Sequence, residues 1–298
     1  MASQSRKPLI TTILVLVILG VASFAFLGSG KKAPETPPII AEPVNLGPIR
    51  KTIGYSVENR PIDAFSFGSG PTHLVFVGGI HGGYEWNSVL LAYRFMDYLS
   101  DTPDTIPKDL TVTVIPSANP DGVYKVVGKG GRFSESDAST DKETLASGRF
   151  NAHKVDLNRN FDCKWQPKST WQNKTVSAGG KAFSEPEAEA IRSFVAETHP
   201  DAVVFWHSQA NAVYASQCEN GILPETLEIM DAYSEASEYK SVKTFDAYEV
   251  TGASEDWLAS QNIPALTVEL QTRETVEFDR NLAGIKALFD YYAQKTGN

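Results

Sequence analysis

The stretch Leu74-Val75-Phe76-Val77-Gly78-Gly79-Ile80-His81-Gly82-Gly83-Tyr84-Glu85-Trp86-Asn87 places a histidine and a glutamate directly after a short apolar run. The run is rich in β-preferring residues and ends at paired glycines, which is typical of a buried strand. Glycines on both sides of His81 let the backbone turn sharply and leave space near the imidazole. We predict a helix from about Asn87, a good N-cap residue. His81 and Glu85 should therefore lie where a strand ends, the usual ligand site of open α/β sheets.

Predicted strands and helices alternate along the rest of the chain. This alternation implies an α/β fold, with a mostly parallel, mixed central sheet and helices on both faces. Residues 116–122 are predicted to form a turn-rich loop, and residues 128–148, which lack periodicity, a surface loop. The other predicted strands are one from Ile53, one ending at Phe67, and 110–115, 201–206 and 265–268; the other predicted helices are 185–197, 224–236, 253–261 and 281–294.

Side chains that suit a metal ion follow two of these strands, His81 with Glu85 and then His207. If the sheet is mainly parallel, the strand ends lie along one edge and these residues can meet. Two imidazoles and one carboxylate are typical zinc donors and leave a fourth position open, as in catalytic sites. A histidine and a glutamate four positions later are a weak signal alone. The alternative for His207 is a hydrogen-bonded core histidine.

Glu269 follows another strand at the same predicted edge. A catalytic zinc ion acidifies water, and a separate carboxylate is needed to take the proton and pass it to a leaving amine. Glu269 is placed for that work, and the alternative is a carboxylate at the rim of the sheet.

The segment Val155-Asp156-Leu157-Asn158-Arg159-Asn160-Phe161 carries a different signal. A guanidinium is a planar fork that matches a carboxylate, so Arg159 with Asn158 could bind the C-terminal carboxylate of a peptide. Arg149 lies a short loop upstream and could stabilise an oxyanion at a scissile carbonyl. Ordinary surface ion pairs are the alternative for both arginines.

The N-terminal region has its own pattern. Residues 9–27 are apolar, carry no charge and are long enough to cross a bilayer, so we predict a transmembrane signal-anchor or, alternatively, a secretory signal peptide. Residues 1–8 form a short tail, residues 28–49 a Pro-rich linker and residues 50–298 the folded domain. We therefore expect a membrane-anchored domain outside the cytoplasm, or a secreted one if the segment is cleaved.

Composition adds two further expectations. The formal net charge of -9 argues against a nucleic-acid partner, which normally requires a basic face. We expect a monomer. Cys163 and Cys218 follow the predicted site segments, and they are either joined in a disulfide or are two buried thiols.

Seven segments, in order, resemble the M14 family of zinc metallocarboxypeptidases, which have the carboxypeptidase A-like fold and a bacterial branch of murein peptide amidases. The resemblance covers residues 53–270, most of the folded domain. The segments are IGYSVENRPI (53–62), GGIHGGYEWN (78–87), NPDG (119–122), VDLNRNF (155–161), FWHS (205–208), YEVTGASEDW (248–257) and ALTVEL (265–270).

The resemblance implies a role for each matching residue. One zinc ion per chain would be bound by His81, Glu85 and His207, and Glu269 would be the general base and acid. The substrate would be held by Asn158 and Arg159 at its terminal carboxylate, by Arg149 at its carbonyl and by Tyr248, which resembles a mobile tyrosine that closes over the site. One departure stands out, because the family motif has the glutamate three residues after the histidine and this chain has it four residues after.

Three functions remain open on the sequence. The first is a carboxypeptidase that prefers a basic or amino-bearing terminal residue, because Glu255 occupies the position that faces the terminal side chain in this family. If Glu255 turns to solvent, that preference disappears. The second is a γ-D-glutamyl-diaminopimelate amidase that acts on cell-wall muropeptides. The third is a non-catalytic peptide-binding module, although such members usually lack a zinc ligand or the catalytic glutamate.

Overall fold

The computed structural model describes residues 47–296. The predicted signal-anchor at 9–27 and nearly all of the linker at 28–49 lie outside this range. Within it, none of the helices combines the length and the apolar character that a bilayer crossing requires.

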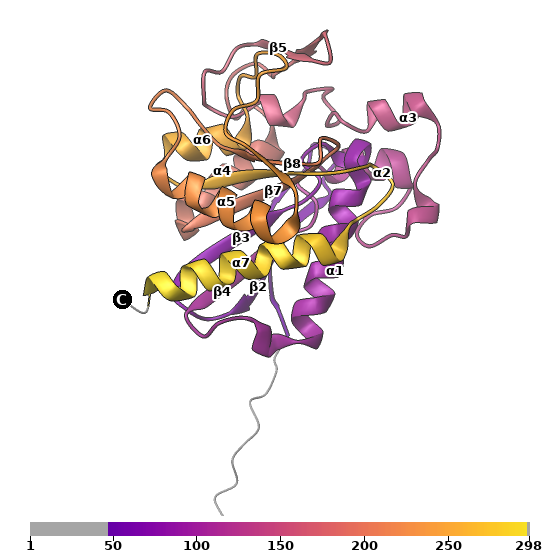
Figure 1. Ribbon diagram of the computed structural model, residues 1–298. Coiled ribbons are helices and arrows are strands. Elements are labelled where there is room, and N and C mark those ends of the chain that lie inside the picture. The colour runs from indigo at the N-terminus through magenta and orange to yellow at the C-terminus, as the bar shows by residue number, and fades with distance from the viewer. Residues whose placement is uncertain (1–46, 297–298) are drawn as a thin grey trace, which may run out of the picture. The chain divides into compact units, whose positions relative to one another are not determined.

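An eight-stranded mixed sheet forms the centre of the described domain (Figure 1). Its middle strands β4, β3, β7 and β10 are parallel, and the antiparallel pairs lie at β1–β2, β2–β4 and β10–β8. The expected α/β fold with a parallel centre is therefore present. The strands in sheet order are β1 Ile49–Tyr55, β2 Pro61–Gly68, β4 Leu110–Ile115, β3 Thr72–Val77, β7 Ala202–Ser208, β10 Ala265–Leu270, β8 Ala212–Ala215 and β9 Lys240–Val242.

Helices cover both faces of the sheet, because side chains along each central strand alternate between two cores. In β3, Leu74 and Phe76 face one core with α1, α5 and α7, whereas Val75 and Val77 face the other with α4 and α6. Figure 1 shows α7 crossing in front of the sheet. The α-helices are α1 Trp86–Asp101, α2 Pro120–Val127, α3 Lys142–Ser147, α4 Pro186–Thr198, α5 Pro224–Ser237, α6 Ser254–Ser260 and α7 Phe278–Thr296.

The strand register places the candidate residues at one edge. Val77 at the end of β3 lies opposite Phe205 of β7, and Glu269 of β10 lies opposite His207 of β7. The loop that carries His81 therefore leaves the sheet beside the strand that carries His207.

Three local predictions are wrong. The stretch 116–122, predicted as a loop, is loop only as far as Asn119, because helix α2 begins at Pro120. The stretch 128–148 is not only loop, because it contains a 3₁₀ turn at Glu135–Asp137 and helix α3, which Asp141 caps by accepting from the Thr144 backbone N–H. Asn87 is not an N-cap, because α1 begins at Trp86. Its side-chain amide instead donates to the carbonyls of Thr272 and Thr275, and so fixes the loop after β10.

The sequence analysis also missed a short hairpin, β5 Lys168–Trp171 with β6 Lys174–Ser177. Of the two states considered for the cysteines, the structure contains the disulfide between Cys163 and Cys218, which lie 55 positions apart.

Candidate active site and metal centre

A 3₁₀ turn, η1 Gly82–Glu85, begins directly after His81 and brings the Glu85 side chain back toward it. The turn packs tightly against both backbone and side-chain atoms of neighbouring segments. A Cβ on Gly82 would stand 2.4 Å from the Gly148 carbonyl oxygen, and one on Gly83 would stand 2.4 Å from Val126 Cβ. Because positions 82 and 83 are glycines, the turn fits into this narrow space, and the Glu85 side chain reaches His81 although it is four residues away in sequence.

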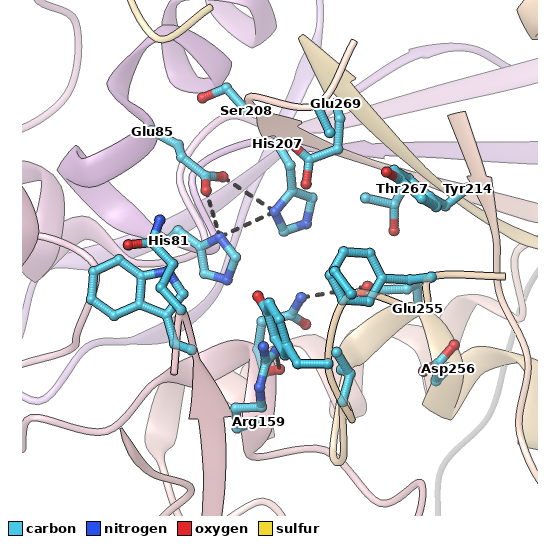
Figure 2. Close-up of a pocket in the computed structure, with 18 of the residues that line it drawn as sticks. His81, Glu85, Arg159, His207, Ser208, Tyr214, Glu255, Asp256, Thr267 and Glu269 are labelled. Carbon is cyan, nitrogen blue, oxygen red and sulfur yellow. Dashed lines mark hydrogen bonds and ion pairs between the residues drawn. The ribbon is translucent and has the colours of Figure 1, made fainter. Parts of the chain in front are cut away.

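Three side chains converge at that point (Figure 2). The Nδ1 atom of His81 is 2.9 Å from Glu85 Oε1, the Nδ1 atom of His207 is 3.2 Å from Glu85 Oε2, and the two Nδ1 atoms are 3.1 Å apart. Donor atoms about 2.1 Å from one tetrahedral zinc ion stand about 3.4 Å apart. All three side chains are buried, so the spacing, donor types and seclusion fit a zinc ion.

The charges in the cluster follow from burial and from Glu85. Burial and the nearby Arg149 charge lower the pKa of His81 to about 4, which keeps this imidazole neutral as a metal ligand must be. Burial opposes the charge of His207 most strongly, but its hydrogen bond to Glu85 and the Glu85 charge, together with the charges of Glu269 and Glu255, outweigh burial and raise its pKa to about 9. The Glu85 pKa stays well below its usual value despite burial, because both histidines favour the carboxylate.

Asp156 is a site residue to which the sequence analysis gave no role. It is fully buried, its Oδ1 lies 3.7 Å from His81 Nε2, and its Oδ2 accepts a 2.8 Å hydrogen bond from Arg149 Nε. Carboxylates behind a ligating histidine fix the ring orientation and make the ligand more basic. The available signal was its position, two residues before Asn158 in a segment already assigned to the site.

Glu269 lies beside this cluster on β10, where Figure 2 shows its carboxylate close to His207. Burial, together with repulsion from Glu85, raises the pKa of Glu269 to about 7. Its Oε2 atom has no hydrogen-bond partner in the described part of the chain. The position thus offers a carboxylate that can gain or lose a proton near neutral pH.

Arg149 is buried, so the alternative of a surface ion pair is wrong for this residue. Beyond its bond to Asp156, its guanidinium lies 4.8 Å from the Trp171 ring centroid, and its Nη1 lies 3.8 Å from Glu85 Oε1. These contacts hold one positive charge next to the candidate metal ligands.

Arg159 is also buried, but its contacts differ. It donates only to main-chain oxygens, those of Asn158 and Thr170, and no carboxylate within residues 47–296 forms an ion pair with it. Asn158 is partly engaged, because its Oδ1 accepts from the Ser254 N–H and hydroxyl and so fixes the start of α6. The Asn158 amide nitrogen faces Glu255 at 3.5 Å.

Glu255 and Asp256 lie in the first turn of α6, at the opposite side of the pocket from Glu85 (Figure 2). Ser254 Oγ donates to Glu255, and the alternative that Glu255 turns to solvent is wrong because the side chain lines the cavity. Burial and repulsion from Glu255 raise the pKa of Asp256 to about 7. Tyr248 lines the same cavity, and the centroid of its ring lies 4.9 Å from the centroid of the Phe245 ring.

All nine residues that the sequence singled out line one cavity of about 520 Å³. The sequence analysis did not select other side chains that also line it. These include Tyr84, Trp171, Lys164 and Arg273.

Comparisons with known proteins agree with this geometry. The sequence profile of the zinc carboxypeptidase family, peptidase M14, matches residues 49–287. The γ-D-glutamyl-L-diamino acid endopeptidase 1 of Lysinibacillus sphaericus is 26% identical over 240 residues, which cover 73% of this chain and 59% of that protein. Murein peptide amidase A of Escherichia coli K12 is 28% identical over 131 residues, 41% of this chain and 50% of that protein. The chain thus spans between half and three-fifths of these relatives.

Two solved structures share the fold. Thrombin-activatable fibrinolysis inhibitor matches with a TM-score of 0.67 and 19% identity, over 83% of this chain and 70% of that one. The murein-tripeptide amidase of Escherichia coli O157 matches with a TM-score of 0.59 and 22% identity, over 82% and 91%. Because the family profile covers most of the chain, this protein belongs to the zinc carboxypeptidase family of metallopeptidases.

Proposed function

We propose that this protein is a zinc-dependent metallocarboxypeptidase that hydrolyses the C-terminal peptide bond of its substrate. The observation that carries the proposal is the buried convergence of His81, Glu85 and His207 with Glu269 beside them. These three ligands would hold one zinc ion. A zinc ion there would polarise the scissile carbonyl and acidify water near neutral pH.

The surrounding residues move protons and stabilise charge. Glu269 takes a proton from the attacking water and gives it to the leaving amine, and a pKa near 7 suits both transfers. Arg149, held by Asp156, donates to the oxyanion that develops on the scissile carbonyl.

Arg159 binds the terminal carboxylate of the substrate. It is a buried cation without an ion-pair partner in residues 47–296, and a carboxylate fits its planar fork. The amide nitrogen of Asn158 adds a donor, and Tyr248 closes over the bound residue from the segment between β9 and α6.

Glu255 sets the preference for the terminal side chain. Glu255 is partly buried in the cavity wall, and a carboxylate removed from water is costly unless it is paired, so a lysine, an arginine or a diamino acid such as diaminopimelate should bind best. Peptides ending in Arg, Phe and Glu test this preference, and equal hydrolysis of the Arg and Phe peptides would remove it.

The second candidate is hydrolysis of γ-D-glutamyl-diamino acid bonds in muropeptides. It is favoured by the similarity to a γ-D-glutamyl-L-diamino acid endopeptidase and to a murein peptide amidase. The acidic Glu255 end of the cavity also suits the second amino group of a diamino acid. Mass spectrometry of digested muropeptides distinguishes it from a general carboxypeptidase.

The deciding experiment is a C-terminal residue-release assay on the full chain, zinc-loaded and metal-depleted, with Glu269→Gln as the control. We expect one zinc ion per chain, chelator-sensitive release, and loss of release in the variant. A folded chain that binds peptides but releases no residue with zinc bound would instead indicate the non-catalytic binding module.

We propose that residues 9–27 anchor the domain outside the cytoplasm, and the Cys163–Cys218 disulfide supports an oxidising compartment. Cell fractionation with alkaline carbonate washing tests the anchor, since an anchored chain stays in the membrane pellet.

A further inference from the structure

Arg273 is a cation of the active-site cavity to which the proposed mechanism gives no work. It lies on the loop after β10 and lines the cavity with the candidate metal ligands. Its guanidinium lies 4.1 Å from the centroid of the Tyr84 ring. It has neither an ion-pair partner nor a hydrogen-bond acceptor among residues 47–296, and its Nε atom is buried without a partner.

The loop holds Arg273 in place. Asn87 donates to the carbonyls of Thr272 and Thr275 at 2.7 and 2.9 Å, and the hydroxyls of those two threonines bond to each other at 2.8 Å. The residue is therefore anchored on both sides. A positioned guanidinium that stacks on a ring and leaves its donors open is suited to bind an anion.

The position of Arg273 along the cavity indicates which part of a substrate would contact its guanidinium. Arg159 and Glu255 occupy the end that takes the released residue. Tyr84 directly precedes Glu85, and Figure 2 shows Glu85 on the other side of the pocket from Glu255. A peptide with its terminal carboxylate at Arg159 and its scissile carbonyl at the metal ligands must continue toward Tyr84 and Arg273.

The charge balance points the same way. The Arg149 charge is paired with Asp156, but Arg159 and Arg273 have no ion-pair partner in the described chain. The C-terminal carboxylate of a substrate can neutralise only one of those two. A second substrate carboxylate, on the acyl side of the scissile bond, would neutralise the other.

We propose that Arg273 binds a carboxylate on the acyl side of the scissile bond, so the preferred substrate carries a glutamyl residue directly before the released residue. Glutamate has a carboxyl group at each end of one short carbon chain. Whether the α- or the γ-carboxyl forms the scissile amide, the other is free at a similar distance. This inference rests on the proposed peptidase function and names its substrate class.

Two matched pairs of peptides test it. The α-linked pair is N-acetyl-Glu-Lys and N-acetyl-Gln-Lys, and the γ-linked pair is Ala-γ-D-Glu-Lys and Ala-D-isoglutaminyl-Lys. In each pair the acyl residue presents either a free carboxylate or a neutral amide. We expect kcat/KM to be about tenfold higher for the acid of at least one pair, the size of one charge-assisted hydrogen bond. The pair that shows the difference identifies the linkage.

The variants assign that preference to one side chain. Arg273→Gln should bring the acid-to-amide ratio of kcat/KM down to about one, and Arg273→Lys should keep part of the preference. Lys164→Gln removes another cation from the same cavity, one whose charge acts on Asp256, and should leave the acid-to-amide ratio unchanged.

Calorimetric binding of the same pairs to Glu269→Gln separates this inference from the proposed function. Tighter binding of the acid that disappears with Arg273→Gln supports Arg273 even if no peptide is hydrolysed. Equal hydrolysis and equal binding of acid and amide overturn the inference and leave the peptidase proposal standing. An acid preference that persists in Arg273→Gln also overturns it.

Discussion

Asp156 shows how one buried carboxylate can connect two parts of the site. It lies behind His81 and also holds Arg149, so it orients a candidate metal ligand and a candidate oxyanion donor together. An isosteric amide would keep the volume and lose the charge. Its effect on the metal should therefore be visible without measuring catalysis.

Asp156→Asn should weaken zinc binding about 10- to 100-fold, because a carboxylate behind a ligating histidine increases its basicity and fixes its ring. Competition against a chromophoric chelator measures the affinity. Asp162→Asn is the matched control, since Asp162 lies in the same segment but is exposed. Equal affinity in Asp156→Asn and wild type would mean that Asp156 does not support His81.

His73 gives a pH prediction away from the candidate site. Burial lowers its pKa from 6.5, although the Asp201 charge opposes this, and its Nε2 is 2.8 Å from the Thr113 hydroxyl. The folded state therefore takes up this proton less readily than the unfolded chain. Its contribution to stability is present above about pH 6.5 and is lost as the pH falls toward the lowered pKa.

Urea unfolding between pH 5 and pH 8 should thus show a steeper loss of stability on acidification for wild type than for His73→Gln. The comparison isolates His73, since the other titrating groups are shared. Parallel curves for the two proteins would contradict the assignment.

At the scale of elements, the sequence predicted the long periodic or strongly apolar segments well. The central strands and helices α1 and α4 to α7 were placed within a few residues, because burial on one or two faces leaves a regular pattern. Helix α2 was missed because its N-cap and first residues, Asn119-Pro120-Asp121-Gly122, have the composition of a turn. The short elements α3, β5, β6, β8 and β9 were missed because four to six residues, or fewer, give no period to detect. Asn87 was misplaced because its bonds go to a loop that only tertiary folding brings near.

The residues of the candidate site also divide into those that the sequence could predict and those that it could not. His207 and Glu269 could be selected because they end strands, and parallel strand ends share an edge. Arg273 could not, because its loop shows no pattern and its place against Tyr84 depends on the fold. The four-residue His–Glu spacing was left as a departure until turn η1 explained it.

Turn η1 makes a prediction about its glycines. Gly83→Ala should cost about 1–3 kcal/mol of stability and weaken zinc binding, because the new methyl group would overlap Val126 and push Glu85 away from His81. Thermal unfolding and zinc titration measure the two effects.

The double variant Gly83→Ala with Val126→Gly should recover part of the zinc affinity, because it removes the Val126 Cβ and Cγ2 atoms and leaves only the Gly122 carbonyl oxygen, at 2.7 Å, close to the new methyl group. Gly130→Ala is the control, since nothing lies within 4 Å of a Cβ at that position. If Gly83→Ala bound zinc as tightly as Gly130→Ala, the tight packing would not be what positions Glu85.

At the scale of the whole molecule, the disulfide joins two distant parts of the cavity wall. The Cys163 carbonyl accepts from the Gly252 N–H, and Phe161 N–H donates back to the Gly252 carbonyl, so this segment also holds the start of α6. The bond therefore stabilises the end of the cavity that contains Glu255. The end that contains the candidate metal ligands is held instead by β3, β7 and turn η1.

Cys163→Ser with Cys218→Ser should lower the free energy of unfolding by about 4 kcal/mol, the loop-closure term for a link of this span. Since the bond supports the Glu255 end, the variant should keep its zinc affinity at temperatures where it stays folded, while KM for a C-terminal Lys peptide rises. Denaturant unfolding, zinc competition and steady-state kinetics measure the three quantities. Weakened zinc binding with an unchanged KM would show that the disulfide instead supports the half of the cavity that contains His81 and Glu85.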